Sequence, residues 1–200
     1  MPDLPPADVL DLFAVPGDLS RLSGDRGDRV RAGDLLLSPG RDPEVQAWLS
    51  PMLARLAVRL DERPGRHPRD LRIAMPVPAR DGSWVVDGWG ASRYEPGTVV
   101  CDDLDVALAA GRLLHAELDS LVRERPPGLD VDPGSPGPDQ LVHAALDGNV
   151  LLDARGAPVV VDVTPAWRTV QWAEERLRQA QQDQAQQDQA QQDQAGSSPT

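Results

Sequence analysis

The segment LVHAALDGNVLL, Leu141 to Leu152, carries the side chains of this chain that could do chemistry. An imidazole (His143), a carboxylate (Asp147) and a carboxamide (Asn149) fall close together among apolar residues. Imidazoles and carboxylates are the usual general acids and bases of enzymes. Two alanines follow the histidine, however, where a reactive loop would be expected to carry charge. The question is whether this segment is an active-site loop, and whether it keeps the chemistry of one.

Outside this segment, reactive side chains are few. Cys101 is the only cysteine of the chain, so no internal disulfide can form. The three histidines, at positions 67, 115 and 143, are scattered and have no metal-ligand spacing. We therefore expect no structural zinc site.

Composition limits the classes of partner. Acidic residues number 32 against 20 basic ones, for a net charge of −12, and every basic residue is an arginine, because the sequence contains no lysine. Binding to nucleic acid or to an anionic membrane needs clustered basic side chains, so neither partner is expected. The first residues lack a signal-peptide pattern and no apolar run is long enough to cross a bilayer, which predicts a cytoplasmic protein. A length of 200 residues suits one domain or two small lobes that share a cleft.

Strands are predicted in three places that must position the reactive segment. Residues 23–38 are glycine-punctuated and predict a hairpin of two strands. Residues 71–94 predict three strands, with Asp81-Gly82 as the favoured two-residue turn between two of them. Apolar runs at 149–152 and 158–161 flank a polar turn and predict a β-hairpin directly after the reactive segment.

Helices are predicted around these strands. Residues 6–13 form a short helix, and apolar residues at three- and four-residue steps predict a longer one that starts after Asp42-Pro43 and reaches Leu60. The same periodicity predicts a helix over 104–121, and Pro165 is expected to open a final helix.

The end of the chain has low complexity. The pentapeptide QAQQD occurs three times from Gln179, and its five-residue period carries no apolar position beyond alanine. This period does not produce the seam of a coiled coil. Residues 179–200 are therefore predicted to be a solvated helical extension or disordered.

The reactive segment and the following APVVVDVTPAW together resemble the catalytic segment of the aminoglycoside phosphotransferase-like, kinase-fold family, and more specifically a small actinobacterial branch of it. The branch pattern is apolar-apolar-His-Gly-Asp-Leu-x-Gly-Asn-apolar, then a hairpin that ends in Asp, then Pro-x-Trp-Arg. Eight residues stand at matching positions: His143, Leu146, Gly148, Asn149, Asp162, Pro165, Trp167 and Arg168. The resemblance implies an α+β, protein kinase-like two-lobed fold. Residues 1–94 would form an antiparallel N-lobe and residues 95–178 a truncated helical C-lobe with a catalytic-loop-like hairpin.

The family transfers the γ-phosphoryl group of ATP to the hydroxyl of a small molecule, and it uses bound Mg²⁺ and a set of positioned charges. The resemblance assigns Asn149 and Asp162 as the metal ligands, with oxygen atoms that suit Mg²⁺. His143 would be structural at the base of the loop. The remaining positions would contact the nucleotide: Gly24, Gly27, Ser38, Tyr94 and Glu95.

This sequence departs from the family pattern at the catalytic positions. Ala145 stands where the family has its catalytic aspartate, and a methyl group cannot accept a proton. Ser38 stands where the family has its strand lysine. In the glycine-rich loop, Asp25 and Asp28 would repel a triphosphate. Asp147 is the remaining candidate for a vestigial base.

Four functions are compatible with the sequence. The first is a phosphotransferase-like pseudoenzyme that lacks phosphoryl transfer and binds a protein partner, or a nucleotide with Mg²⁺. The second is an active, atypical ATP-dependent phosphotransferase that uses Asp147 and an arginine. The third is a small acidic interaction protein that acts through its tail, and the fourth is a decayed gene product without a selected function.

Overall fold

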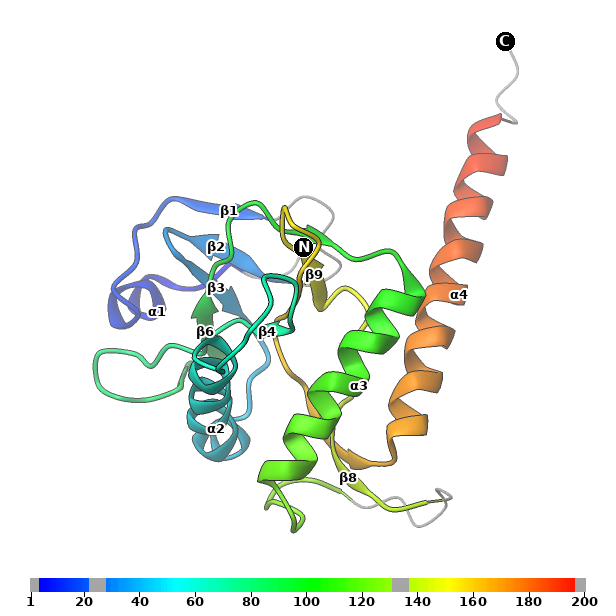
Figure 1. Ribbon diagram of the computed structural model, residues 1–200. Helices are drawn as coiled ribbons and strands as arrows, with labels where there is room; N and C mark the ends of the chain where they lie inside the picture. Colours follow the sequence, from blue (N-terminus) through cyan, green and yellow to red (C-terminus); the bar gives the residue numbers. More distant parts are fainter. Residues whose placement is uncertain (1–3, 22–27, 131–136, 197–200) are drawn as a thin grey trace. The chain divides into compact units, whose positions relative to one another are not determined.

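The computed structural model describes residues 4–21, 28–130 and 137–196, with side chains described as far as residue 190. It is a mixed α+β structure in which the described residues form four helices and eleven strands (Figure 1). Two compact units are formed from interleaved parts of the chain. The first comprises Met1–Cys101, Pro126–Gly128 and Gly148–Val163, and the second comprises Asp102–Arg125, Leu129–Asp147 and Thr164–Thr200.

The division of the chain therefore differs from a single boundary between residues 94 and 95. The first unit continues to Cys101 and takes in the later segment Gly148–Val163. The reason is strand pairing, because the hairpin in this later segment hydrogen-bonds to strands from the first half of the chain.

The first unit contains a five-stranded antiparallel sheet, in the order β1-β2-β3-β6-β5. Its strands are β1 (Leu19–Arg21), β2 (Val30–Ala32), β3 (Leu35–Ser38), β5 (Val85–Val86) and β6 (Trp89–Arg93). The predicted hairpin is confirmed in β2 and β3, where Ala32 pairs with Leu35 across a two-residue turn. Gly33 in this turn has a positive φ of 60°, which glycine adopts without strain.

The prediction of the next hairpin turn was wrong. The two-residue turn is Asp87-Gly88, with φ of 47° and 75°, and it joins β5 to β6. Two positive φ values are typical of the type I′ turn that matches the twist of a hairpin. Asp81-Gly82 instead closes a local turn in which Ala79 N donates to Ser83 O at 2.8 Å. Pro76 and Pro78, which precede this turn, lack the N–H that a longer ladder would need.

The two faces of β3 meet different helices of the first unit. Leu35 and Leu37 belong to an apolar cluster with residues of α1 (Ala7–Leu12) and its C-terminal end, including Val9 and Phe13. Side chains alternate along a strand, so Leu36 and Ser38 point to the opposite face. That face is the one that meets α2 (Pro43–Asp61), because Ser38 shares a cavity with residues of this helix.

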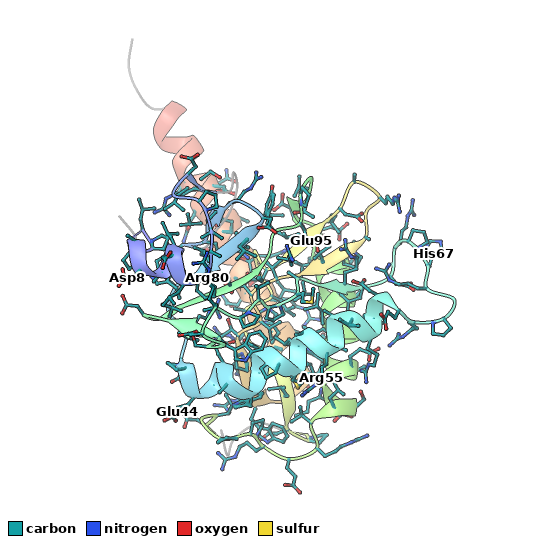
Figure 2. The ribbon with its side chains drawn as sticks, turned by 90° about the vertical axis from the view of Figure 1, so that its left-hand side faces the viewer. Asp8, Glu44, Arg55, His67, Arg80 and Glu95 are labelled. Carbon is teal, nitrogen blue, oxygen red and sulfur yellow. The ribbon has the colours of Figure 1, made fainter. Side chains whose placement is uncertain are left out.

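Helix α2 starts as predicted. The Asp42 carboxylate accepts hydrogen bonds from the backbone N–H groups of Glu44 and Val45, at 2.8 and 3.1 Å, which caps the helix, and Pro43 occupies its first position. Figure 2 shows Glu44 at this end, Arg55 farther along the helix and His67 in the loop beyond it.

A second sheet of the first unit has the order β4-β10-β9-β7. Its strands are β4 (Arg72–Ile73), β7 (Val99–Val100), β9 (Val150–Leu152) and β10 (Pro158–Val160). The predicted hairpin is confirmed in β9 and β10, and β10 pairs in parallel with β4. The Asp153 carboxylate organises the turn by accepting from the N–H groups of Arg155 and Ala157 at 2.8 and 2.9 Å. These two bonds hold the pKa of Asp153 below its ordinary value.

The second unit consists of helices α3 (Leu104–Leu121) and α4 (Val170–Gly196) and the strand pair β8 (Gln140–His143) and β11 (Pro165–Arg168). The bounds predicted for α3 are confirmed, with Asp103 as its N-cap. The prediction that Pro165 opens a helix was wrong, because Pro165 begins β11 and pairs with His143. A proline is tolerated at the first position of a strand. The helix begins at Val170 instead, where the Thr169 hydroxyl accepts from Trp172 N at 3.1 Å.

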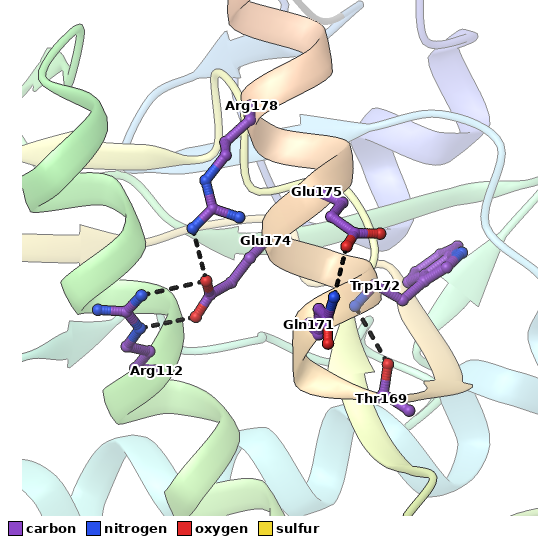
Figure 3. Close-up of polar contacts among 7 residues, drawn as sticks. All are labelled: Arg112, Thr169, Gln171, Trp172, Glu174, Glu175 and Arg178. Carbon is purple, nitrogen blue, oxygen red and sulfur yellow. Dashed lines mark hydrogen bonds and ion pairs between the residues drawn. The ribbon is translucent and has the colours of Figure 1, made fainter. Parts of the chain in front are cut away.

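Helices α3 and α4 lie side by side and are joined by charge (Figures 1 and 3). The Glu174 carboxylate of α4 accepts from Arg112 of α3 at 2.6 and 3.1 Å and from Arg178 at 2.8 Å. The hydrogen bond from Arg112 holds the pKa of Glu174 below its ordinary value.

The repeat continues α4 as a solvated helix through Gly196, which is one of the two alternatives predicted from its composition. Gln179 donates to Asp183 at 2.7 Å and Gln184 donates to Asp188 at 2.8 Å, so the same four-residue step recurs in successive pentapeptides. Within the described ranges, no helix is both long enough and apolar enough to span a bilayer.

Candidate functional site

The two predicted metal ligands flank one hairpin of the first unit. Asn149 directly precedes β9, and Asp162 follows β10 after one intervening residue, Val161. The backbone N–H of Val161 donates to the carbonyl of Asn149 at 2.9 Å. Strand pairing therefore brings the two positions to the same open end of the hairpin, as the sequence pattern required.

Asn149 is bonded to an arginine. Arg29 Nη1 donates to the carboxamide Oδ1 of Asn149 at 2.7 Å, and Arg29 Nη2 donates to the carbonyl of Gly148 at 2.9 Å. Arg29 is only 3% exposed, so this contact is made inside the unit. The oxygen that would have to coordinate a metal is thus accepting a hydrogen bond from a guanidinium group.

Asp162 is bonded to a second arginine. Its carboxylate forms an ion pair with Arg41, and the two side chains are only 20% and 13% exposed. Asp162 has a φ of 57°, in the left-handed region that aspartate tolerates better than most residues. This backbone conformation and the ion pair together fix the direction of the carboxylate.

Gly90 of β6 makes room for Arg41. A Cβ built on Gly90 would lie 3.2 Å from Arg41 Cγ, so the arginine stem passes directly over the strand at this glycine. The backbone N–H of Arg41 also donates to the carbonyl of Gly88 at 2.8 Å. The backbone and the stem of Arg41 are therefore both held against the five-stranded sheet.

A cavity of about 40 Å³ lies beside this ion pair. It holds a few water molecules at most, since one water needs roughly 10–15 Å³ by the same measure. Its polar wall includes Ser38 of β3 together with Gln46 and Ser50 of α2, and Ser50 Oγ donates to Gln46 Oε1 at 2.6 Å. The other lining residues are Arg41, Leu53, Ile73, Ala74, Pro76, Trp84, Gly90, Ala91, Ser92, Asp162 and Val163.

The predicted nucleotide contacts divide into three groups. Gly24 and Gly27 lie outside the described residues. Ser38 lines the cavity with Asp162, so these two positions are brought together. Tyr94 and Glu95 are not among its lining residues.

Both of these outlying residues have contacts of their own. The Arg31 guanidinium lies 4.3 Å from the centre of the Tyr94 ring. The Glu95 carboxylate pairs with Arg72 of β4, with oxygens at 3.0 and 2.9 Å from Nη2.

His143, Ala145 and Asp147 belong to the second unit. His143 is fully buried, and its Nδ1 accepts from the N–H groups of Ala145 and Thr164, both at 3.2 Å. One imidazole thus holds a residue of the loop after β8 and the residue that directly precedes β11. The role that the resemblance assigns to His143 stays a prediction. Asp147 lies in the turn that ends the loop and is half-buried.

A second histidine that the sequence did not single out for a role supports the first. His115 of α3 is 1% exposed, and its Nε2 accepts from the backbone N–H of His143 at 3.1 Å. Its Nδ1 has no hydrogen-bond partner among the described residues. Burial in this apolar setting lowers the pKa of His115 to about 4, so the ring is neutral at physiological pH.

Sequence reasoning did not identify Arg29 and Arg41 as the partners of Asn149 and Asp162. The resemblance pointed to Asn149 and Asp162 but said nothing of what would contact them. The available signal was the complete replacement of lysine by arginine, because a bidentate guanidinium pairs with carboxylate and amide oxygens in a way that an ammonium does not.

The residues present do not fit a bound Mg²⁺ ion. Magnesium needs oxygen ligands that are free to coordinate it, whereas here Asn149 Oδ1 and one carboxylate oxygen of Asp162 meet guanidinium groups. Across residues 4–21, 28–130 and 137–196, no three His, Cys, Asp or Glu side chains gather into a metal-binding group. In comparisons with known proteins, no family model matches this sequence and no curated protein shows significant similarity to it.

Proposed function

We propose that this chain is a phosphotransferase-like pseudoenzyme, related to the aminoglycoside phosphotransferase-like family with its kinase-like, two-lobed fold, and that it acts by binding rather than by phosphoryl transfer. One observation carries the proposal. The two positions that would hold the metal in an active relative, Asn149 and Asp162, are each bonded to an arginine of the same unit.

Three further features support the proposal. Phosphoryl transfer depends on a strand lysine paired with a helix glutamate in protein kinases, and on a loop aspartate that accepts the substrate proton. Here Ser38 of β3 and Gln46 of α2 line the same cavity, and both side chains are uncharged. Ala145 occupies the aspartate position. Removal of such groups typically costs several orders of magnitude in rate.

The proposal is tested by phosphoryl-transfer and hydrolysis assays. The purified chain is incubated with Mg²⁺ and ATP or GTP, alone and with a panel of aminoglycosides and small alcohols. We expect no turnover above that of the Asp162→Asn variant. Turnover that Asp162→Asn or Asp147→Asn abolishes would instead show that the chain is an active, atypical phosphotransferase.

A nucleotide titration separates the two forms of binding. A ligand at about 100 times its Kd stabilises a protein by about 2.7 kcal/mol, which is visible as a rise in Tm. If ATP raises Tm, the bound partner is a nucleotide, and the same titration with EDTA shows whether the metal takes part. If Tm does not change, the nucleotide is excluded as the ligand, and a protein partner is sought next by pull-down, with the helix from Gln179 onward as the first segment to delete.

A further inference from the structure

We infer that Arg29 and Arg41 form a clamp between two hairpins and supply, from within the chain, the positive charge that a divalent cation would supply in an active relative. The inference rests on the proposed function, because the correspondence of Asn149 and Asp162 with metal ligands comes from it. It goes further by predicting that the β9–β10 hairpin does not take up a divalent cation, and that Arg41, which pairs with Asp162, prevents it.

The arrangement of the clamp is paired. Arg29 directly precedes β2 and Arg41 follows β3, so the arginines stand on the two strands at the open end of the β2–β3 hairpin. Their partners stand on the two strands at the open end of the β9–β10 hairpin. Each arginine contacts one partner, and the two sheets of the first unit are joined by charged hydrogen bonds at this position.

The chemistry of guanidinium makes this charge permanent. Arginine cannot be deprotonated in proteins, and its planar fork can serve two acceptors at once, as Arg29 does with Asn149 Oδ1 and Gly148 O. A divalent cation at the same oxygens would meet two positive charges at close range. The arginines and the cation are therefore mutually exclusive at this site.

Burial distinguishes these contacts from ordinary surface ion pairs. The Arg80–Asp11 pair of the same unit has side chains that are 63% and 80% exposed, with N and O 3.5 Å apart. The Arg41–Asp162 pair is mostly withdrawn from water and is held by the backbone and by the close approach to Gly90. Breaking a buried pair costs far more than breaking an exposed one.

The first test measures Tm without nucleotide, for the wild type, Arg41→Met and the double variant Arg41→Met/Asp162→Asn, in EDTA and in millimolar MgCl₂. We expect no effect of Mg²⁺ on the wild type. Arg41→Met should lower Tm by on the order of 10 °C and regain part of that loss in Mg²⁺. The double variant should show no response, and Arg80→Met, the matched control, should leave Tm and its response to Mg²⁺ unchanged.

A second test uses Tb³⁺, which takes oxygen ligands and emits when a nearby tryptophan is excited. Trp84 lines the cavity together with Asp162, so it is placed to sensitise an ion bound there. We expect wild-type emission to be the same with and without Trp84→Phe, since ions on the acidic surface do not depend on this tryptophan. In Arg41→Gln, which keeps a hydrogen-bond donor and is expected to fold even if the methionine variant does not, emission should rise and should fall again with Trp84→Phe.

Two results would overturn the inference. One is a rise in wild-type Tm with Mg²⁺ that Asp162→Asn abolishes. The other is the absence of any Trp84-dependent Tb³⁺ emission in Arg41→Gln. Both measurements omit nucleotide, so they are separate from the turnover assays. Catalysis by the wild type would refute the proposed function, whereas cation uptake by the wild type without catalysis would refute only the clamp.

Discussion

Two polar contacts buried in different units hold the two parts of the reactive segment by different chemistry. In the first unit, both strands at the open end of the hairpin β9–β10 are bonded to guanidinium groups, from Arg29 and Arg41. In the second unit, the loop after β8 is held by two histidines, of which the neutral His115 accepts from the backbone of His143. One contact depends on permanent charge and the other on the absence of charge.

The difference shows that one segment can be held in place by two kinds of polar contact. Hydrogen bonds to a charged group are among the stronger polar contacts in proteins, and breaking them leaves a buried charge unpaired. A buried neutral imidazole is stable only while it stays neutral. The two contacts should therefore respond differently to mutation and to pH.

The largest expected effect comes from removing the carboxylate of the clamp. Asp162→Asn leaves the largely buried Arg41 side chain without this counter-charge, and we expect a loss of about 3–5 kcal/mol in the free energy of unfolding. Urea unfolding followed by circular dichroism measures it. Asp11→Asn, which removes the partner of the exposed Arg80, should change stability by less than about 0.5 kcal/mol. Equal losses in the two variants would break the distinction between buried and exposed pairs.

The next effect is a dependence on pH that belongs to the second unit. The pKa of His115 is about 4 in the folded protein, below the ordinary value near 6.5. The unfolded chain therefore takes up a proton between these values while the folded chain does not, so stability falls as pH is lowered from 6.5 to 4. The loss amounts to about 3 kcal/mol.

The measurement is the free energy of unfolding at several pH values for the wild type and for His115→Gln. Between pH 6.5 and 4, we expect the free energy of unfolding of the variant to depend less steeply on pH, by the contribution of about one proton, because its amide does not titrate. His67→Gln, at an exposed histidine, is the control and should keep the wild-type slope. If the wild-type and His115→Gln slopes coincide, the histidine pair is not the pH-sensitive contact.

A smaller effect is expected at the other arm of the clamp. Arg29→Met leaves Asn149 Oδ1 and Gly148 O without the hydrogen bonds that Arg29 donates, at a cost of about 2 kcal/mol. Arg29→Lys keeps the charge but cannot reproduce the fork, so its loss should be intermediate. Urea unfolding of the three proteins gives the order. A lysine variant as stable as the wild type would show that charge alone, without the two-pronged geometry, holds this end of the hairpin.

Local sequence signals predicted the elements of the fold well where a short-range cause exists. Helices α2 and α3 begin directly after Asp42 and Asp103, whose carboxylates cap the first turn, and capping is visible within three residues. The hairpin β9–β10 was predicted from two apolar runs around a polar turn. The Asp-Gly signal was present twice, and the neighbouring prolines decided which of the two turns extends into a ladder.

Long-range contacts could not be predicted in the same way. Arg29 and Asn149 are 120 residues apart in the chain, and no periodicity or turn signal connects them. Residues Pro165–Arg168 likewise form a strand, and not the predicted start of a helix, because they pair with β8. The sequence pattern located the hairpin that carries Asn149 and Asp162, but only the tertiary structure reveals that their partners are arginines.

The smallest expected effect extends the comparison to the charge cluster between α3 and α4 (Figure 3). Glu174→Gln removes the carboxylate that accepts from Arg112 and Arg178, whose side chains are 58% and 39% exposed. These arginines regain water when the partner is lost, so we expect a loss of only about 0.5–1 kcal/mol in the free energy of unfolding at neutral pH.

The pKa of Glu174 is lowered in the folded protein, so its contribution to stability is present above the ordinary pKa of glutamate and disappears as pH falls through the folded value. The pH interval over which the Glu174 contribution disappears lies at or below pH 4.5, whereas the His115 contribution changes between pH 6.5 and about 4. A stability loss in Glu174→Gln that is the same at pH 7 and pH 5 would therefore show that Glu174 and His115 act separately. A loss as large as that of Asp162→Asn would show instead that exposure does not set the strength of charged contacts in this protein.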